Sequence, residues 1–147
     1  KAGLSLEEVA QKVEAVIPNI NILVYVDTVK FMVKNGRLSS TAGALASLLK
    51  IKPILRMNQH DGSLVAYEKI RTSKKALNRL YEIFTEETKD RDIVAFVVYT
   101  NNKPFAEEVK KHLLTIKPGI KIELVPLTPV VGAHAGPGTL GVGYIYI

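Results

Sequence analysis

The 147-residue chain has the length and composition of one folded domain, since 47% of its residues are hydrophobic and 23% are charged, which excludes a disordered polymer. It contains no cysteine, which excludes disulfides and thiolate zinc sites, and its longest apolar run, residues 93–99, is far too short to span a membrane. The net charge of +6 is scattered among glutamates without interleaved aromatic residues, which argues against nucleic-acid binding. We expect a cytoplasmic domain and, because the chain begins at Lys1 without a methionine, part of a longer protein.

The first residues predict a helix followed by a strand. Ser5 and Glu8 have the spacing of a capping box, and the apolar residues that follow recur on one helical face as far as Ile17. Residues 20–26, INILVYV, are typical of a buried strand. Asp27 is expected to cap a short helix that ends at Asn35-Gly36.

The middle of the chain predicts a further helix and a hairpin. Ser39 or Ser40 is expected to cap a small-residue helix that runs to Leu49. Residues 51–57 and 63–70 have strand character and flank a glycine-containing turn, which predicts a β-hairpin.

The second half of the chain alternates helices with strands. Thr72 or Ser73 is expected to cap a helix with a clean apolar stripe, and a buried strand is predicted over 92–100. A helix capped by Asn102, a strand over 120–127 and a strand after residue 141 complete the chain. Because the hairpin and the closing strands break strict alternation, we expect an α/β fold, namely a two-layer domain with a mixed β-sheet covered by helices.

Residues 136–141 match G-x-G-x-x-G, the pattern of dinucleotide-binding loops. That pattern binds a pyrophosphate only when a strand enters it and a helix leaves it, because the helix N-terminus supplies the amides. Here only a short strand-like ending follows, so nucleotide binding is excluded.

His134 lies just ahead of this pattern, in a stretch of small residues that we predict to be a tight turn. An imidazole there can donate to a carboxylate or phosphate oxygen, or it can be a structural histidine bonded to a backbone carbonyl, and the sequence leaves both interpretations open. His60 and His112 are expected on the surface. The three histidines lack metal-ligand spacing, so no metal site is predicted.

Arg37 and Arg71 each precede a predicted helix start. A cation there opposes the positive end of the helix dipole by about 0.3–1 kcal/mol, which favours an intervening anion. The alternative is an arginine that points into solvent or pairs with Glu68. Because the sequence has no G-x-S-x-G elbow, P-loop or H-E-x-x-H motif, we predict no catalytic residue and no enzyme activity.

The ordered segments VKNGRLSS, LLKIKPIL, DGSLVAYEKIRTSKKAL and HAGPGTLGVGY resemble the C-terminal part of the DegV family of bacterial fatty-acid-binding proteins. The resemblance implies that residues 1–147 are the C-terminal lobe of that fold and that the N-terminal lobe is absent from this chain. It also implies that the two lobes enclose one long-chain fatty acid without a cofactor. The protein would then be a carrier that presents the fatty acid carboxylate to a separate fatty acid kinase, which forms an acyl phosphate for phospholipid synthesis.

The resemblance assigns roles to three residues. His134 matches the histidine of the H-[ST]-G-P-G motif near the ligand carboxylate, and Arg71 matches an arginine at the same polar end that is also associated with kinase docking. Arg37 matches an arginine on the rim of the pocket mouth. Ala135 replaces the usual serine or threonine, which removes a hydroxyl beside His134, and Asn35-Gly36 replaces a glycine pair.

Several apolar side chains are candidates to line an acyl tunnel: Phe31, Met32, Leu45, Leu48, Ile54 and Leu55. The positive charge is consistent with docking to an acidic kinase surface or with transient contact with an anionic membrane surface. Two other functions stay open at this point: a protein-interaction domain of the same fold that binds no lipid, and a hydrolase or transferase that uses His134 as its base.

Overall fold

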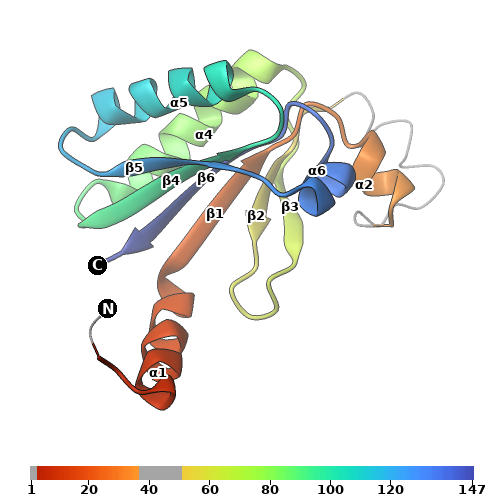
Figure 1. The fold of residues 1–147 in the computed structure, drawn as a ribbon. Coiled ribbons are helices and arrows are strands. Elements are labelled where there is room, and N and C mark those ends of the chain that lie inside the picture. Colours follow the sequence, from red (N-terminus) through yellow and green to blue (C-terminus); the bar gives the residue numbers. More distant parts are fainter. Residues whose placement is uncertain (1–2, 37–50) are drawn as a thin grey trace.

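The computed structural model describes residues 3–36 and 51–147, which form a six-stranded mixed sheet with helices (Figure 1). The helices in this part of the chain are α1 (Leu6–Val16), α2 (Lys30–Lys34), α4 (Ser73–Thr88), α5 (Lys103–Ile116) and α6 (Pro129–Ala135), with a 3-10 turn η1 (Ile17–Asn19). The strands are β1 (Ile20–Tyr25), β2 (Ile54–Met57), β3 (Leu64–Glu68), β4 (Ile93–Tyr99), β5 (Ile122–Pro126) and β6 (Leu140–Tyr146).

The strands follow the order β3-β2-β1-β6-β4-β5. All neighbouring pairs are antiparallel except β4 and β5, which are parallel. Both the predicted α/β class with a mixed sheet and the predicted hairpin, β2–β3, are confirmed. No helix within the described ranges combines the length and the apolar character that crossing a bilayer requires.

The two faces of the sheet are covered unequally (Figure 1). Helices α4 and α5 pack over one face, where Phe84 and Leu113 contribute to the larger hydrophobic cluster. Helices α2 and α6 lie over one end of the other face, where Met32 and Ala135 join a smaller cluster. Leu23 belongs to the larger cluster and Val24 to the smaller one, because successive residues of a strand point to opposite faces.

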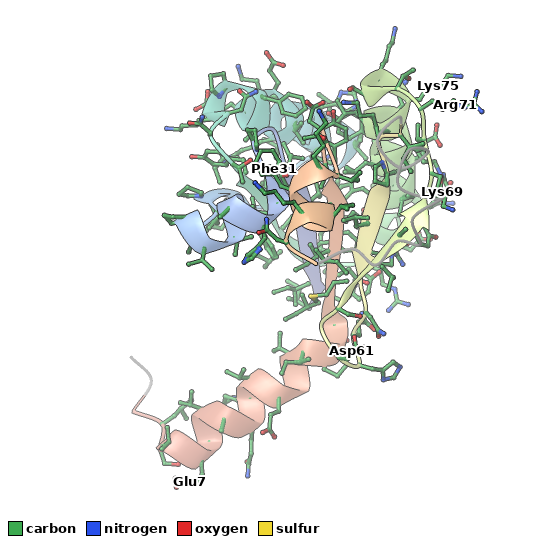
Figure 2. All side chains as sticks on the ribbon, turned by 90° about the vertical axis from the view of Figure 1, so that its right-hand side faces the viewer. Glu7, Phe31, Asp61, Lys69, Arg71 and Lys75 are labelled. Atoms are coloured by element: carbon green, nitrogen blue, oxygen red, sulfur yellow. The ribbon has the colours of Figure 1, made fainter. Side chains whose placement is uncertain are left out.

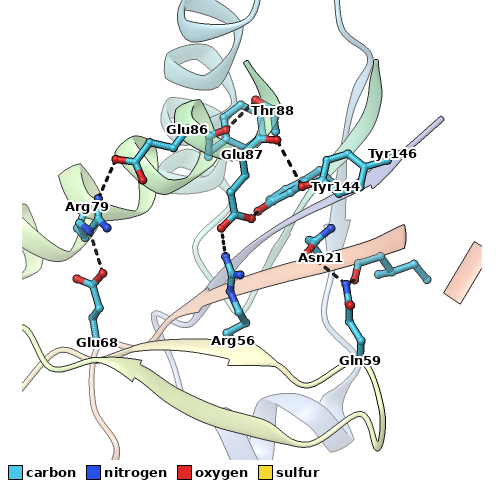
Figure 3. A network of polar contacts seen from close by, with 12 residues as sticks. Asn21, Arg56, Gln59, Glu68, Arg79, Glu86, Glu87, Thr88, Tyr144 and Tyr146 are labelled. Carbon is cyan, nitrogen blue, oxygen red and sulfur yellow. Dashed lines mark hydrogen bonds and ion pairs between the residues drawn. The ribbon is translucent and has the colours of Figure 1, made fainter. Parts of the chain in front are cut away.

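A polar network fastens α4 to the sheet (Figure 3). The Glu87 carboxylate accepts hydrogen bonds from Arg56 on β2 and from the Tyr144 hydroxyl on β6. Burial, together with this bond to Glu87, raises the pKa of Tyr144 well above its ordinary value, so the hydroxyl remains a donor at neutral pH. Nearer the start of α4, Arg79 donates to Glu68 of β3 at 2.9 Å. These contacts hold the helical layer in one position relative to the strands.

Three predicted helix caps are confirmed, and one is wrong. Ser5, Thr72 and Asn102 accept backbone hydrogen bonds at the starts of α1, α4 and α5. Asp27 does not cap α2, which begins at Lys30. The Asp27 carboxylate instead pairs with Lys52 at 2.7 Å and accepts from the Tyr25 hydroxyl, and the hydrogen bond from Lys52 lowers the pKa of Asp27.

The structure also corrects the prediction for the glycine-rich stretch. His134 lies in the last turn of the helix α6, not in a tight turn, and β6 begins at Leu140 rather than after residue 141. Pro129 occupies the first turn of α6, where its fixed φ suits a helix, and Gly136 ends the helix with a φ of 86°. A helix therefore enters the G-x-G-x-x-G pattern and a strand leaves it, the reverse of a dinucleotide-binding loop.

Several predictions concern residues outside the described ranges. They are the helix over 40–49, the rim residue Arg37, and the lining candidates Leu45 and Leu48.

We predict that Gly143→Ala destabilises the sheet. A Cβ at Gly143 would lie 2.1 Å from Cζ of Phe96, its cross-strand neighbour, so the ring or the strand has to move. The free energy of unfolding in urea should fall by about 1 kcal/mol, the low end for overpacked sites, because the half-buried Phe96 ring belongs to neither hydrophobic cluster and can shift. Gly132→Ala is the matched control, because a Cβ there meets its nearest atom, Cγ2 of Thr100, at 3.8 Å. Equal stability of the two variants would contradict the proposed clash.

Candidate functional site

A pocket of about 530 Å³ lies where α2, α6 and the β2–β3 hairpin meet. Its volume is within the range of about 300–1,000 Å³ that is usual for ligand pockets. Its lining is mainly apolar with two polar side chains, and consists of Met32, Gly36, Gly62, Ser63, Leu64, Val130, Val131, His134 and Ala135. The arrangement suits an apolar ligand that carries a polar group at one position.

The imidazole of His134 is the main polar feature of the pocket wall. Its Nδ1 atom is buried and has no hydrogen-bond partner among the described residues. Buried polar atoms are almost always hydrogen-bonded, because leaving one unsatisfied costs about 1–3 kcal/mol. Within the described ranges the alternative of a histidine whose Nδ1 is bonded to a backbone carbonyl is therefore not observed, and the ring that carries this nitrogen lines the pocket.

Two buried threonines fix the segment that follows His134. The Thr100 hydroxyl, at the end of β4, donates to the Gly136 carbonyl at 2.8 Å and accepts from the Thr139 backbone at 3.0 Å. The Thr139 hydroxyl donates to the Ala135 carbonyl at 2.9 Å. Together these bonds anchor the C-terminus of α6 to the sheet. The sequence analysis did not single out either threonine, because no local pattern links residues this far apart.

Helix α2 supports α6 from the other side. The Asn35 side chain donates to the Phe31 carbonyl at 2.8 Å and to the Ala133 carbonyl at 3.2 Å. The Phe31 ring packs so closely on Gly136 that a Cβ there would lie 2.5 Å from Cδ2 of Phe31. The Asn35 side chain thus links α2 to α6, at a position where the resemblance leads one to expect glycine.

Of the described residues that were predicted to line an acyl tunnel, only one lines this pocket. Met32 lines the pocket, whereas Phe31 packs on Gly136 and is not among the lining residues. Ile54 and Leu55 are fully buried in the larger and the smaller hydrophobic cluster, respectively, and are also absent from the lining.

Arg71 is exposed on the connection between β3 and α4 and is not among the pocket's lining residues. Figure 2 shows Lys69, Arg71 and Lys75 along the same edge of the molecule. Glu68, the alternative partner considered for Arg71, pairs with Arg79. Arg71 and its two lysine neighbours thus form an exposed cationic edge at the start of α4.

The other histidines do not contribute to the pocket. His60 and His112 are exposed, as expected. Among residues 3–36 and 51–147, no group of three or more His, Cys, Asp or Glu side chains is arranged to hold a metal ion.

Comparison with known proteins gives consistent matches over almost the whole chain. The family model described as "Uncharacterised protein, DegV family" matches residues 1–146. A DegV domain-containing protein of Streptococcus pneumoniae is 38% identical over 143 residues, which make up 97% of this chain and 50% of that relative. The chain therefore spans about half the length of the curated relatives it matches.

Two solved structures share the fold and concern fatty acids. A fatty acid binding DegV family protein from Streptococcus agalactiae has a TM-score of 0.83 and 32% identity, covering 97% of this chain and 50% of its own. The Fatty Acid Kinase (Fak) B3 protein of Streptococcus pneumoniae, loaded with linoleic acid, has a TM-score of 0.80 and 26% identity, covering 99% of this chain and 51% of its own.

We predict that Thr100→Val releases the C-terminus of α6. The substitution leaves the Thr139 amide without its acceptor, so the free energy of unfolding should fall by about 1–3 kcal/mol. Hydrogen exchange of the amides of Gly136 and Thr139 should become faster. Thr85→Val is the control, because that exposed hydroxyl bonds only within α4, and its effect should stay within about 0.5 kcal/mol. Unchanged exchange in Thr100→Val would contradict the anchoring role.

Proposed function

Because the chain belongs to the DegV family, we propose that it is the C-terminal lobe of a fatty-acid-binding protein and that it contacts the carboxylate end of the ligand. Solved relatives of this family bind fatty acids. The chain spans about half of their length, and the proposal includes a pocket that residues outside this sequence complete.

One observation carries the proposal: the ring of His134 lines an apolar pocket, and its buried Nδ1 has no hydrogen-bond partner in the part of the chain that the structure describes. When protonated, this nitrogen can donate to a carboxylate oxygen, and a bond to a charged acceptor is stronger than one between neutral groups. The acyl chain supplies most of the affinity, at about 0.8 kcal/mol per buried methylene. The imidazole would then decide which end of the fatty acid lies at the α6 wall.

The composition of the pocket favours binding over chemistry. Among the described residues that line it, only His134 and Ser63 carry a titratable group or a hydroxyl, and none carries a carboxylate or an amine. Acid–base catalysis requires positioned proton donors and acceptors on both reacting groups. Our proposal is accordingly a carrier, whose bound carboxylate is phosphorylated by a separate kinase.

Arg71 supports the partnership with a kinase. It is exposed beside Lys69 and Lys75, so this edge can attract an acidic protein surface at long range. Since Arg71 is not among the lining residues of the His134 pocket, we assign it to docking rather than to ligand contact. Arg37 is assigned to the rim on the resemblance alone. With a nucleotide-using kinase as its partner, the protein would work in the cytoplasm, which is part of the proposal.

We predict that His134→Ala in the complete gene product weakens binding of oleate by about 10-fold to 100-fold. The expected loss corresponds to a hydrogen bond to a charged group, about 1.5–3 kcal/mol. Titration calorimetry measures it, with the exposed His60→Ala as the control that should bind normally. Unchanged affinity in His134→Ala would contradict the role of the imidazole. A gene product that binds no fatty acid would favour a lipid-free interaction domain.

We also predict that Arg71→Glu slows phosphorylation of the bound fatty acid by the kinase without changing oleate affinity. The reversed charge should raise the KM of the kinase for the loaded carrier, and added salt should reduce the difference because it screens exposed charges. Lys89→Glu, at the opposite end of α4, is the charge-matched control. Equal KM values for the two variants would exclude docking at this edge. Arg71→Glu that loses oleate affinity would indicate ligand contact instead.

A further inference from the structure

Strand β3 is an edge of the six-stranded sheet, and no described strand pairs with its outer side (Figure 1). Its apolar side chains are also open to solvent: Leu64, Val65 and Tyr67 are 38%, 46% and 44% exposed. An edge strand presents unpaired backbone N–H and C=O groups, which make it a template for another strand. An edge strand with exposed apolar side chains therefore indicates an interaction surface.

The opposite edge of the sheet, β5, is protected against such pairing. Glu123 places a charge on the strand, Lys121 lies just before it, and Pro126 lacks a backbone N–H. Charged residues and proline are devices by which natural edge strands avoid association. In β3 the only charged residue is Glu68, at the last position. The two edges thus differ, and β3 is the one suited to pairing.

The backbone groups that β3 presents outward follow from its contacts with β2. The Ser63 carbonyl accepts from the Asn58 amide at 2.8 Å, so the backbone of Ser63 points toward β2. Successive residues of an antiparallel strand point their backbone groups to opposite sides, so Leu64 and Ala66 point outward and Val65 points inward. The irregularity in the β2–β3 register comes only after Ala66. Leu64 and Ala66 thus each offer an N–H and a C=O to a further strand.

These groups allow β3 to pair with β3 of a second copy. When two copies align antiparallel about a two-fold axis at Val65, Leu64 of each lies opposite Ala66 of the other, and each pair exchanges both of its backbone bonds. The two Val65 side chains then face each other, and directly opposite side chains on a sheet pack together. The strand is therefore complementary to itself in its backbone register.

The charges at the two ends of β3 fit the same alignment. Asp61 precedes the strand and Lys69 and Arg71 follow it, and Figure 2 shows them at opposite ends. All three side chains are exposed. Antiparallel pairing brings Asp61 of each copy to the end where Lys69 of the other lies, whereas a parallel alignment would bring like charges together.

We propose that β3 is a dimerisation surface, at which two copies of this protein pair as antiparallel edge strands about an axis at Val65. A short strand gives a small interface, so the dimer is weak and reversible. Arg71 borders this edge, so the dimer would shield the residue that we assign to kinase docking, and the two associations would exclude each other. The inference does not rest on the proposed function, because the pairing requires neither fatty acid nor kinase.

Sedimentation equilibrium of the complete gene product tests the pairing. We expect a reversible dimer whose dissociation constant rises at least about 10-fold in Lys69→Asp, because two like-charge contacts then form in each dimer. Asp61→Lys should weaken the dimer similarly, and the double substitution should restore most of the affinity, since the charges are then exchanged. Lys121→Asp, at the opposite edge, is the charge-matched control and should dimerise normally.

The backbone contacts have a separate test that leaves the charges unchanged. Ala66→Pro removes an outward N–H that β2 does not use, so the protein should fold and the dimer should weaken at least about 10-fold. Ala66→Ser keeps this N–H and should dimerise normally. The thermal unfolding of each variant, measured in parallel, shows that the fold is retained.

Two results would overturn the proposal. One is a complete gene product that stays monomeric up to about 1 mM, whether β3 is free or is covered by another part of the polypeptide. The other is a dimer that Lys69→Asp and Lys121→Asp weaken equally, or that the double substitution does not restore, because a different surface would then be the interface. Neither readout depends on bound fatty acid, so a failure of the proposed ligand leaves this test intact.

Discussion

A buried imidazole nitrogen without a partner among the described residues is the constraint on which the functional interpretation depends. This nitrogen is Nδ1 of His134, whose ring lines a mainly apolar pocket, and a buried polar atom without a hydrogen bond is costly. The surrounding structure holds the ring in that position rather than relieving it: Thr100 anchors the C-terminus of α6, Asn35 ties α6 to α2, and Gly136 admits the Phe31 ring. A ligand oxygen at Nδ1 would supply the missing bond, and only a ligand with a long apolar part would also use the rest of the pocket.

The two faces of the sheet differ in role: the face under α4 and α5 stabilises the fold, and the opposite face contains the candidate site. The larger hydrophobic cluster lies under α4 and α5, and the contacts of Glu87 with Arg56 and Tyr144 tie α4 to the same face (Figure 3). The opposite face has the smaller cluster and, at one end, the His134 pocket. The packed layer on one side thus supports the pocket on the other side, where we propose that a ligand is seated.

Sequence reasoning was most successful where the determining contacts are local. The caps at Ser5, Thr72 and Asn102 and the hairpin follow from residues a few positions apart. It was wrong where contacts between residues far apart in the sequence determine the structure. Asp27 pairs with Lys52 instead of capping a helix. Helix α6 forms although Val130, Val131 and Gly132 are poor helix formers. His134 was selected from its small neighbours, yet its position in a pocket wall depends on α2 and the hairpin, which no local pattern reveals.

The most direct measurement is NMR of the complete protein with ¹⁵N-labelled histidine and oleate labelled with ¹³C at the carboxylate. A bond between Nδ1–H of His134 and the ligand predicts that both the imidazole and the carboxylate resonances shift on loading, and that replacing His134 by glutamine shifts the bound carboxylate signal. A bound carboxylate whose signal is the same with histidine or glutamine at this position, together with imidazole resonances that loading leaves unchanged, would show that the fatty acid headgroup lies elsewhere.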